Sequence, residues 1–295
     1  MNGTTADTAA PSTKPRTGFR WRLISSLVLW GIMLAVVFWL PPTALYIFMN
    51  VVIARAVWEF YVICEAKGLR AYKVWGTIGT IALISGSWFI YGRRDVLAMS
   101  YDFDTLILLI FALGVFIRQF PQKDNPHGIE SMAVTLFGLI YVAWLSNFIT
   151  RINFANDNGR YFVMLLVVVT KFTDMGAYLV GSSIGRHKMI PRISPKKTWE
   201  GTIGGVAFAV GGAFLCRWAM PSEMTGLTTQ HAVVIGVLLG AAAVIGDLAE
   251  SLIKRQAGVK DSSTVLPGHG GALDLIDSFL FTAPLLYVYM RLVLR

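Results

Sequence analysis

The chain has 295 residues, of which 55% are hydrophobic and only 15% are charged, and its net charge is +9. A soluble domain carries about 25% charged residues, so the composition excludes an ordinary soluble protein and indicates a membrane protein with several spans. In a membrane protein, basic residues in the loops set the orientation, and we therefore expect no nucleic-acid partner despite the positive charge.

Residues 1–18 are rich in Thr, Ala and Pro and predict a disordered N-terminal tail. Long apolar runs then predict about nine transmembrane helices, because roughly 20 apolar residues cross the hydrocarbon core as a helix. The runs cover 22–40, 43–64, 74–92, 103–118, 129–150, 161–183, 202–219, 232–254 and 273–294. We expect a single all-α transmembrane domain over 19–295. Within it, 19–160 would form peripheral N-terminal helices, and 161–295 would form the functional helices and loops.

The Lys and Arg residues are spread unevenly between alternate loops. Most of the 26 fall on the side of the N-terminal tail. This bias predicts a cytoplasmic N-terminus and, with nine spans, a C-terminus on the outside. The compact loops fit the cytoplasmic (inner) membrane of a bacterium.

Two of the expected helices carry ionisable pairs. Arg55 and Glu59 are four residues apart and are expected to neutralise each other, with contact to a lipid headgroup as the weaker alternative. Lys171 and Asp174 are three residues apart, so Asp174 either pairs with Lys171 or reaches a bound metal or nucleotide.

The loop over 184–201 is strongly basic and contains the string SPKKTWE. Ser194, Lys196 and Lys197 lie in this string, where a turn, hydroxyl groups and two lysines suit a polyphosphate. The basic residues also fit a role in topology alone.

A second polar region, 247–278, carries most of the acidic residues of interest. Asp247, Glu250 and Lys254 share one face of the eighth expected helix. A glycine-rich loop, PGHGG, precedes Asp274 and Asp277, which lie three residues apart at the start of the ninth helix. Converging carboxylates suit Mg²⁺, although an aspartate at a helix start is also an ordinary cap.

The segments DMGAYLVGSSIGRHK, ISPKKTWEGTIGG and KRQAGVKDSS, with PGHGG and the paired aspartates, together resemble CDP-diacylglycerol synthases, also called phosphatidate cytidylyltransferases. The resemblance implies that CTP and phosphatidic acid, or a related lipid phosphate, give a CDP-lipid and pyrophosphate with Mg²⁺. It also implies an all-helical membrane fold with a polar cavity that faces the cytoplasm. A second cation and a homodimer stay open. The chain has Leu275 where the family usually has Arg after the first aspartate of the pair.

The expected site residues combine this resemblance with the residue patterns. The expected catalytic residues are Lys260, Asp261, Asp274 and Asp277. The expected metal ligands are Asp247, Asp261, Asp274 and Asp277. The expected substrate-binding residues are Asp174, Ser194, Lys196, Lys197, Lys254, Arg255, Ser262, Ser263 and His269.

Three alternatives remain at this point. Leu275 leaves room for a cytidylyltransferase that acts on a different lipid phosphate, or for a lipid-binding pseudoenzyme. Intramembrane charges also occur in transporters, although the sequence contains no evident internal repeat. Transfer from a CDP-alcohol is disfavoured, because the chain lacks the Asp-Gly dipeptide with which the motif of those enzymes begins.

Overall fold

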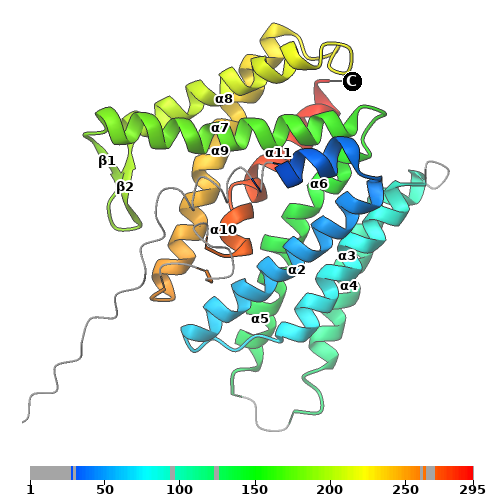
Figure 1. Cartoon of the computed structure of the whole chain (residues 1–295). Helices are drawn as coiled ribbons and strands as arrows, with labels where there is room; N and C mark the ends of the chain where they lie inside the picture. The colour runs from blue at the N-terminus through cyan, green and yellow to red at the C-terminus, as the bar shows by residue number, and fades with distance from the viewer. Residues whose placement is uncertain are drawn as a thin grey trace, which may run out of the picture.

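The computed structural model describes residues 28, 31–93, 97–122, 126–259, 262–263 and 270–294, with side chains omitted at 97–102. The predicted tail 1–18 lies outside the described residues. Helices form nearly all of the described regular structure (Figure 1). In chain order they are η1 (Ala35–Trp39), α2 (Pro42–Ala66), α3 (Lys73–Tyr91), α4 (Leu97–Ile117), α5 (Gly128–Gly138), η3 (Leu139–Trp144), α6 (Leu145–Asn153), α7 (Gly159–Ile184), α8 (Trp199–Ala219), α9 (Thr229–Gln256), α10 (Ala272–Ile276) and α11 (Phe279–Leu292).

Seven segments of the described chain are long and apolar enough to cross a membrane. They are Pro42–Ala66, Lys73–Tyr91, Gly128–Asn153, Gly159–Ile184, Trp199–Ala219, Thr229–Gln256 and Ala272–Leu292. The predicted all-α membrane class is therefore confirmed, but the count of nine is not. The predicted run 22–40 lies partly outside the described residues, and the run 103–118 corresponds to the shorter apolar helix Phe103–Ile117.

The helices α7 and α8 pack closely side by side, as Figure 1 shows. Glycines on α8 make this approach feasible. A methyl group at Gly201 would lie 2.8 Å from the carbonyl oxygen of Ala177, and one at Gly205 would lie 2.9 Å from that of Thr173. Small residues that bring helix backbones together are typical of membrane interiors, where apolar burial does not drive helices together.

A short antiparallel hairpin, β1 (Lys188–Ile190) and β2 (Ser194–Thr198), occupies the basic loop between α7 and α8. The sequence predicted only a polar loop here. Thr198 ends the hairpin and caps α8, because its Oγ1 accepts a hydrogen bond from the Gly201 amide at 3.2 Å. The hairpin is therefore fixed to the start of α8.

A buried polar network joins the N-terminal helices to α6 and α11. Asp104 of α4 is 1% exposed and accepts hydrogen bonds from Arg151 Nη2 at 2.7 Å, Asn147 Nδ2 at 2.9 Å and Ser87 Oγ at 2.7 Å. The Arg151 guanidinium also lies 5.7 Å from the ring centre of Tyr287 on α11. A buried charge is tolerated only when it is paired and hydrogen-bonded, and both conditions hold here.

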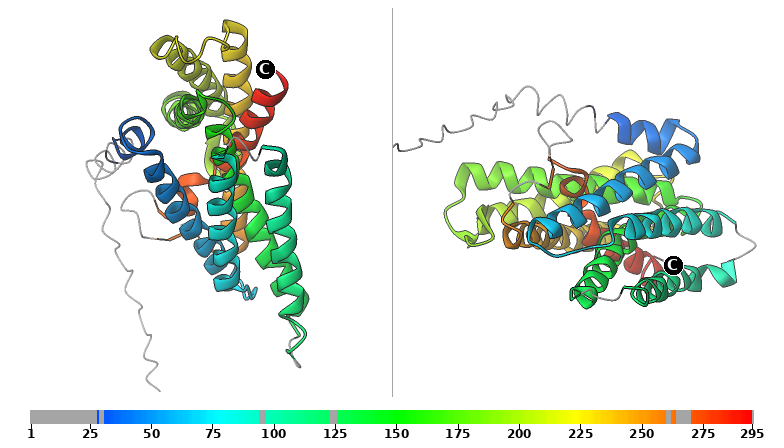
Figure 2. Two further views of the ribbon diagram at one scale, coloured as in Figure 1. Left: turned by 90° about the vertical axis from the view of Figure 1, so that its right-hand side faces the viewer. Right: turned by 90° about the horizontal axis from the view of Figure 1, so that it is seen from below.

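The chain ends on the opposite side from the hairpin. Figure 1 places the C-terminus beside the loop that joins α8 to α9, and the hairpin at the other end of α7. Figure 2 shows the same loop at one end of the molecule, away from α3 and α4, which run side by side. The orientation of these loops relative to the membrane stays a prediction.

Candidate active site

A polar cleft of about 640 Å³ lies between α7, the hairpin, α8, α9 and the start of the last span. The two polar regions selected from the sequence therefore meet in space. The predicted site residues that line the cleft are Asp174, Lys196, Lys197, Asp247, Lys254, Asp274 and Asp277.

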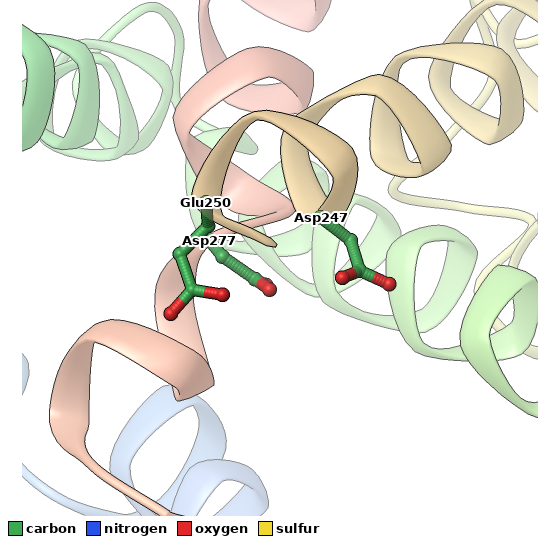
Figure 3. Close-up of side chains that lie close together, drawn as sticks. All are labelled: Asp247, Glu250 and Asp277. Atoms are coloured by element: carbon green, nitrogen blue, oxygen red, sulfur yellow. The ribbon is translucent and has the colours of Figure 1, made fainter. Parts of the chain in front are cut away.

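Three carboxylates form the acidic cluster of the cleft: Asp247, Glu250 and Asp277 (Figure 3). One oxygen atom from each lies within 4.8 Å of the others. Asp247 and Glu250 come from one face of α9, and Asp277 comes from the break between α10 and α11. The two segments come close because Gly246 has no side chain: a methyl group there would lie 2.7 Å from the Asp277 carbonyl oxygen.

The acidic cluster fits a divalent cation. Glu250 is 1% exposed, and its Oε1 has no hydrogen-bond partner among the described residues. Asp277 is also buried, at 8% exposure. Buried carboxylates so close together repel each other strongly at low dielectric, and a bound cation removes that repulsion. An all-oxygen donor set is the kind that Mg²⁺ prefers.

Two lysines border the acidic cluster. Lys197 Nζ lies 2.7 Å from Asp247 Oδ2. Lys254 Nζ lies 2.5 Å from both Glu250 Oε2 and Asp274 Oδ1. The cleft therefore carries positive and negative groups side by side, and such an arrangement can hold a metal ion and an anionic phosphate together.

Asp274 contacts both the loop and Lys254 at the edge of the acidic cluster. Its Oδ2 accepts hydrogen bonds from the Gly271 amide at 2.7 Å, from the Ser262 amide at 3.2 Å and from the Ser262 hydroxyl. These contacts fit the capping alternative, in which an aspartate satisfies free amides at a helix start. Ser262 is itself held by Asp274 and does not line the cleft. The metal role of Asp274 stays a prediction.

Glu59 of α2 holds the same loop from the other side. Its carboxylate accepts hydrogen bonds from Ser263 Oγ at 2.6 Å, from the Leu273 amide at 3.0 Å and from Ser262 Oγ at 3.4 Å. The expected pair with Arg55 is confirmed at 3.0 Å. The contacts with the loop were not predicted, because no local pattern connects residues so far apart in the chain.

The other predicted residues are spread around the cleft. Ser194 begins β2, and Arg255 Nε donates to the Ile193 carbonyl at 3.2 Å, which links the end of α9 to the hairpin. Asp174 accepts a hydrogen bond from Lys171 at 3.1 Å, as one of the two alternatives expected. The remaining predicted residues, Lys260, Asp261 and His269, lie outside the described residues.

Glu250 was not among the expected metal ligands. The sequence pattern could have identified it, because Glu250 follows Asp247 by about one helical turn and was placed on the same face of the helix. Only the position of Asp277, at the break between α10 and α11, completes the cluster around Glu250.

The fold and the cleft define a class: a polytopic membrane protein with an acidic, lysine-bordered site suited to phosphate chemistry. The model of the cytidylyltransferase family matches residues 20–293, and the chain belongs to this family.

Named relatives agree with this assignment. The phosphatidate cytidylyltransferase of Bacillus subtilis is 29% identical over 267 residues, which cover 90% of this chain and 97% of the relative. That of Synechocystis is 36% identical, with 80% of this chain and 84% of the relative covered. An uncharacterized protein of Escherichia coli is 40% identical over 158 residues, and the chain spans only about half (51%) of that protein's length.

Proposed function

We propose that this protein transfers the cytidylyl group of CTP to phosphatidate and so forms CDP-diacylglycerol and pyrophosphate. The observation that carries the proposal is the meeting of the acidic cluster with Lys197 and Lys254 in one cleft at the end of membrane helices. The choice of substrates is supported by relatives that are named phosphatidate cytidylyltransferase and that match this chain over most of their length.

In the proposed reaction, a phosphate oxygen of the lipid attacks the α-phosphorus of CTP. A new P–O bond forms, the bond from the α-phosphorus to the bridging oxygen breaks, and pyrophosphate leaves with that electron pair. The attacking oxygen is already anionic at neutral pH, so no strong general base is required. The barrier comes from bringing anions together in line, which positioning and positive charge overcome.

Lys197 and Lys254 line the cleft and are placed to hold phosphate oxygens. Each already contacts a carboxylate of the site, at 2.7 Å and 2.5 Å, so their ammonium groups are fixed before substrate arrives. A fixed donor costs little reorganisation when the anion binds. Lys196, which is exposed on β2, extends the same positive edge of the cleft.

We assign Mg²⁺ to Asp247, Glu250 and Asp277, with Asp261 and Asp274 as further expected ligands from the sequence. When bound, the ion supplies charge neutralisation for the phosphates of the nucleotide. The carboxylates of this chain hold the cation in place, and the buried position of Glu250 and Asp277 limits competing water.

We place the cleft on the cytoplasmic side of a bacterial inner membrane, because CTP is a soluble nucleotide of the cytoplasm. The bias of Lys and Arg toward the loops on that side supports this orientation.

Transfer by the purified protein in detergent tests the proposal. Radiolabelled CTP, Mg²⁺ and phosphatidate should give CDP-diacylglycerol, and chelation by EDTA should stop the reaction. Leu275 favours a second candidate, a different lipid phosphate as acceptor, because this side chain brings no positive charge where the resembling family carries Arg. Product with another lipid phosphate, and none with phosphatidate, would select that candidate.

A further inference from the structure

A second cavity, of about 330 Å³, lies beside the cleft and is mostly apolar. Its wall is formed by residues of α2, α6, α7, α10 and α11, together with Met33. The polar residues in the wall are Ser146, Lys171 and Asp174. Asp174 also lines the polar cleft, so the two cavities share this residue. We call this cavity the apolar pocket.

Ser146 brings an unsatisfied hydroxyl group to the apolar pocket. The residue is 1% exposed, and its Oγ has no hydrogen-bond partner among the described residues. A serine inside a helix normally bonds the carbonyl one turn earlier, as Thr135 does with Ser131 at 2.6 Å on the preceding helix. A buried hydroxyl without a partner is costly, so its place in the wall indicates a ligand with an acceptor oxygen.

Lys171 provides a positive charge where the apolar pocket approaches the cleft. Its Nζ lies 3.1 Å from Asp174 Oδ2 and 3.5 Å from the Leu275 carbonyl oxygen. An ammonium group has three N–H donors, so Lys171 can bond a phosphate oxygen beside these two acceptors. The Leu275 side chain lines the apolar pocket and enlarges its apolar wall.

We propose that the apolar pocket binds the lipid substrate, with the first part of an acyl chain against α2, an ester carbonyl at Ser146 and the phosphate at Lys171. The inference rests on the proposed function and adds the site of the acceptor lipid to it. The occupant is a membrane lipid because the wall belongs to membrane-spanning segments. The lipid is anionic because Lys171 lies at the end of the apolar pocket that adjoins the cleft.

Two tryptophan variants test whether a lipid occupies the apolar pocket. Val52→Trp fills it, whereas Val51→Trp, on the neighbouring residue, adds the same bulk at a side chain that is 63% exposed and outside the wall. A phosphatidate with a photoreactive group near the glycerol should label peptides of α2, α6 or α7 in the wild type. Val52→Trp should lose this labelling, and Val51→Trp should keep it.

Two smaller changes test the polar contacts. Lys171→Gln should weaken labelling by photoreactive phosphatidate by about tenfold, as for a lost hydrogen bond to a charged group, and should leave labelling by photoreactive diacylglycerol unchanged. Ser146→Ala should weaken labelling by both probes, because both lipids carry the ester carbonyl. Ser146→Ala also tests the proposal if Val52→Trp does not fold.

Labelling does not need turnover, so the labelling experiment tests the lipid site independently of the proposed activity. Pocket labelling without CDP-diacylglycerol would keep the lipid site and overturn the activity. Normal activity with equal labelling of the two tryptophan variants would overturn the lipid site alone. Equal labelling by photoreactive phosphatidylcholine would identify a general membrane lipid and would also overturn it.

Discussion

Glu59 and Ser263 are 204 residues apart in the sequence, yet the Ser263 hydroxyl donates a hydrogen bond to the Glu59 carboxylate across 2.6 Å. Ser262, the residue before Ser263, contacts both Glu59 and Asp274. Asp274 in turn contacts Lys254, which contacts Glu250 of the acidic cluster. A continuous series of hydrogen bonds therefore joins the N-terminal helix α2 to the proposed metal site.

Glu59→Gln should lower the turnover rate by about tenfold or more, because it removes a buried charge that accepts several hydrogen bonds, each worth about 1.5–3 kcal/mol. The Tm in detergent should fall as well. Glu65→Gln is the matched control, since Glu65 lies on the same helix in a more exposed pair with Lys73. Wild-type turnover by Glu59→Gln would show that the loop does not depend on this contact.

Gly271→Ala should reduce both stability and activity. A methyl group at this position would collide with the Glu59 carboxylate and the Ser262 hydroxyl, and overpacking of this kind costs about 1–3 kcal/mol. Gly211→Ala, at an open position of α8, should be neutral or slightly stabilising. Thermal unfolding followed by tryptophan fluorescence measures both. An equal effect of the two changes would contradict the predicted collision.

Glu250→Gln should raise the Mg²⁺ concentration for half-maximal activity by roughly 10–100-fold or more, since even indirect contacts to a metal have effects of that size. Glu223→Gln, on the loop between α8 and α9, is the control, because its hydrogen bond is to the neighbouring Ser222. The measurement is a Mg²⁺ titration of cytidylyl transfer at saturating CTP. An unchanged midpoint in Glu250→Gln would remove this residue from the metal site.

Lys197→Ala should raise the KM for CTP by about 10–100-fold, because one charged hydrogen bond to phosphate is lost and Asp247 loses its partner. The KM for phosphatidate should change less. Lys67→Ala removes a lysine from the loop after α2, outside the cleft, and should leave both constants unchanged. If both lysine variants behave alike, Lys197 does not contact the nucleotide.

The proposed orientation predicts opposite accessibility at the two ends of α7. A cysteine at the exposed Asn156 should react with a membrane-impermeant maleimide in intact cells, and one at the exposed Arg192 should react only in inverted vesicles. The native cysteines Cys64 and Cys216 are buried and should give little background. The reverse pattern would place the cleft outside the cytoplasm.

Hydropathy was sufficient to predict most of the spans. The predicted run 161–183 corresponds to α7 at Gly159–Ile184. The run 273–294 contains a break at 277–278 that was not predicted, because neither Pro nor Gly marks the end of α10. The π-helical segments η1 and η3 were also missed, because one extra residue per turn hardly changes the mean hydropathy.

The site was predictable where its residues share a local pattern. Asp247 and Lys254 stand on one helical face, and Asp277 follows a recognisable loop, so all three were selected. Glu59 was interpreted chiefly as the partner of Arg55, and that pair is present. Its contacts with Ser263 and Leu273 depend on how α2 packs against α10, and that packing has no local signal.

The pair formed by Asp104 and Arg151 has a consequence for biogenesis. Its members are separated by 47 residues, so the acidic member leaves the ribosome first. At a synthesis rate of 5–20 residues per second, roughly 2–10 s pass between the synthesis of Asp104 in α4 and that of Arg151. A carboxylate is expensive in the bilayer interior during that interval. Insertion of α4 should therefore be held at the translocation channel until α6 arrives, and the early helices of this protein should enter the membrane together rather than one at a time.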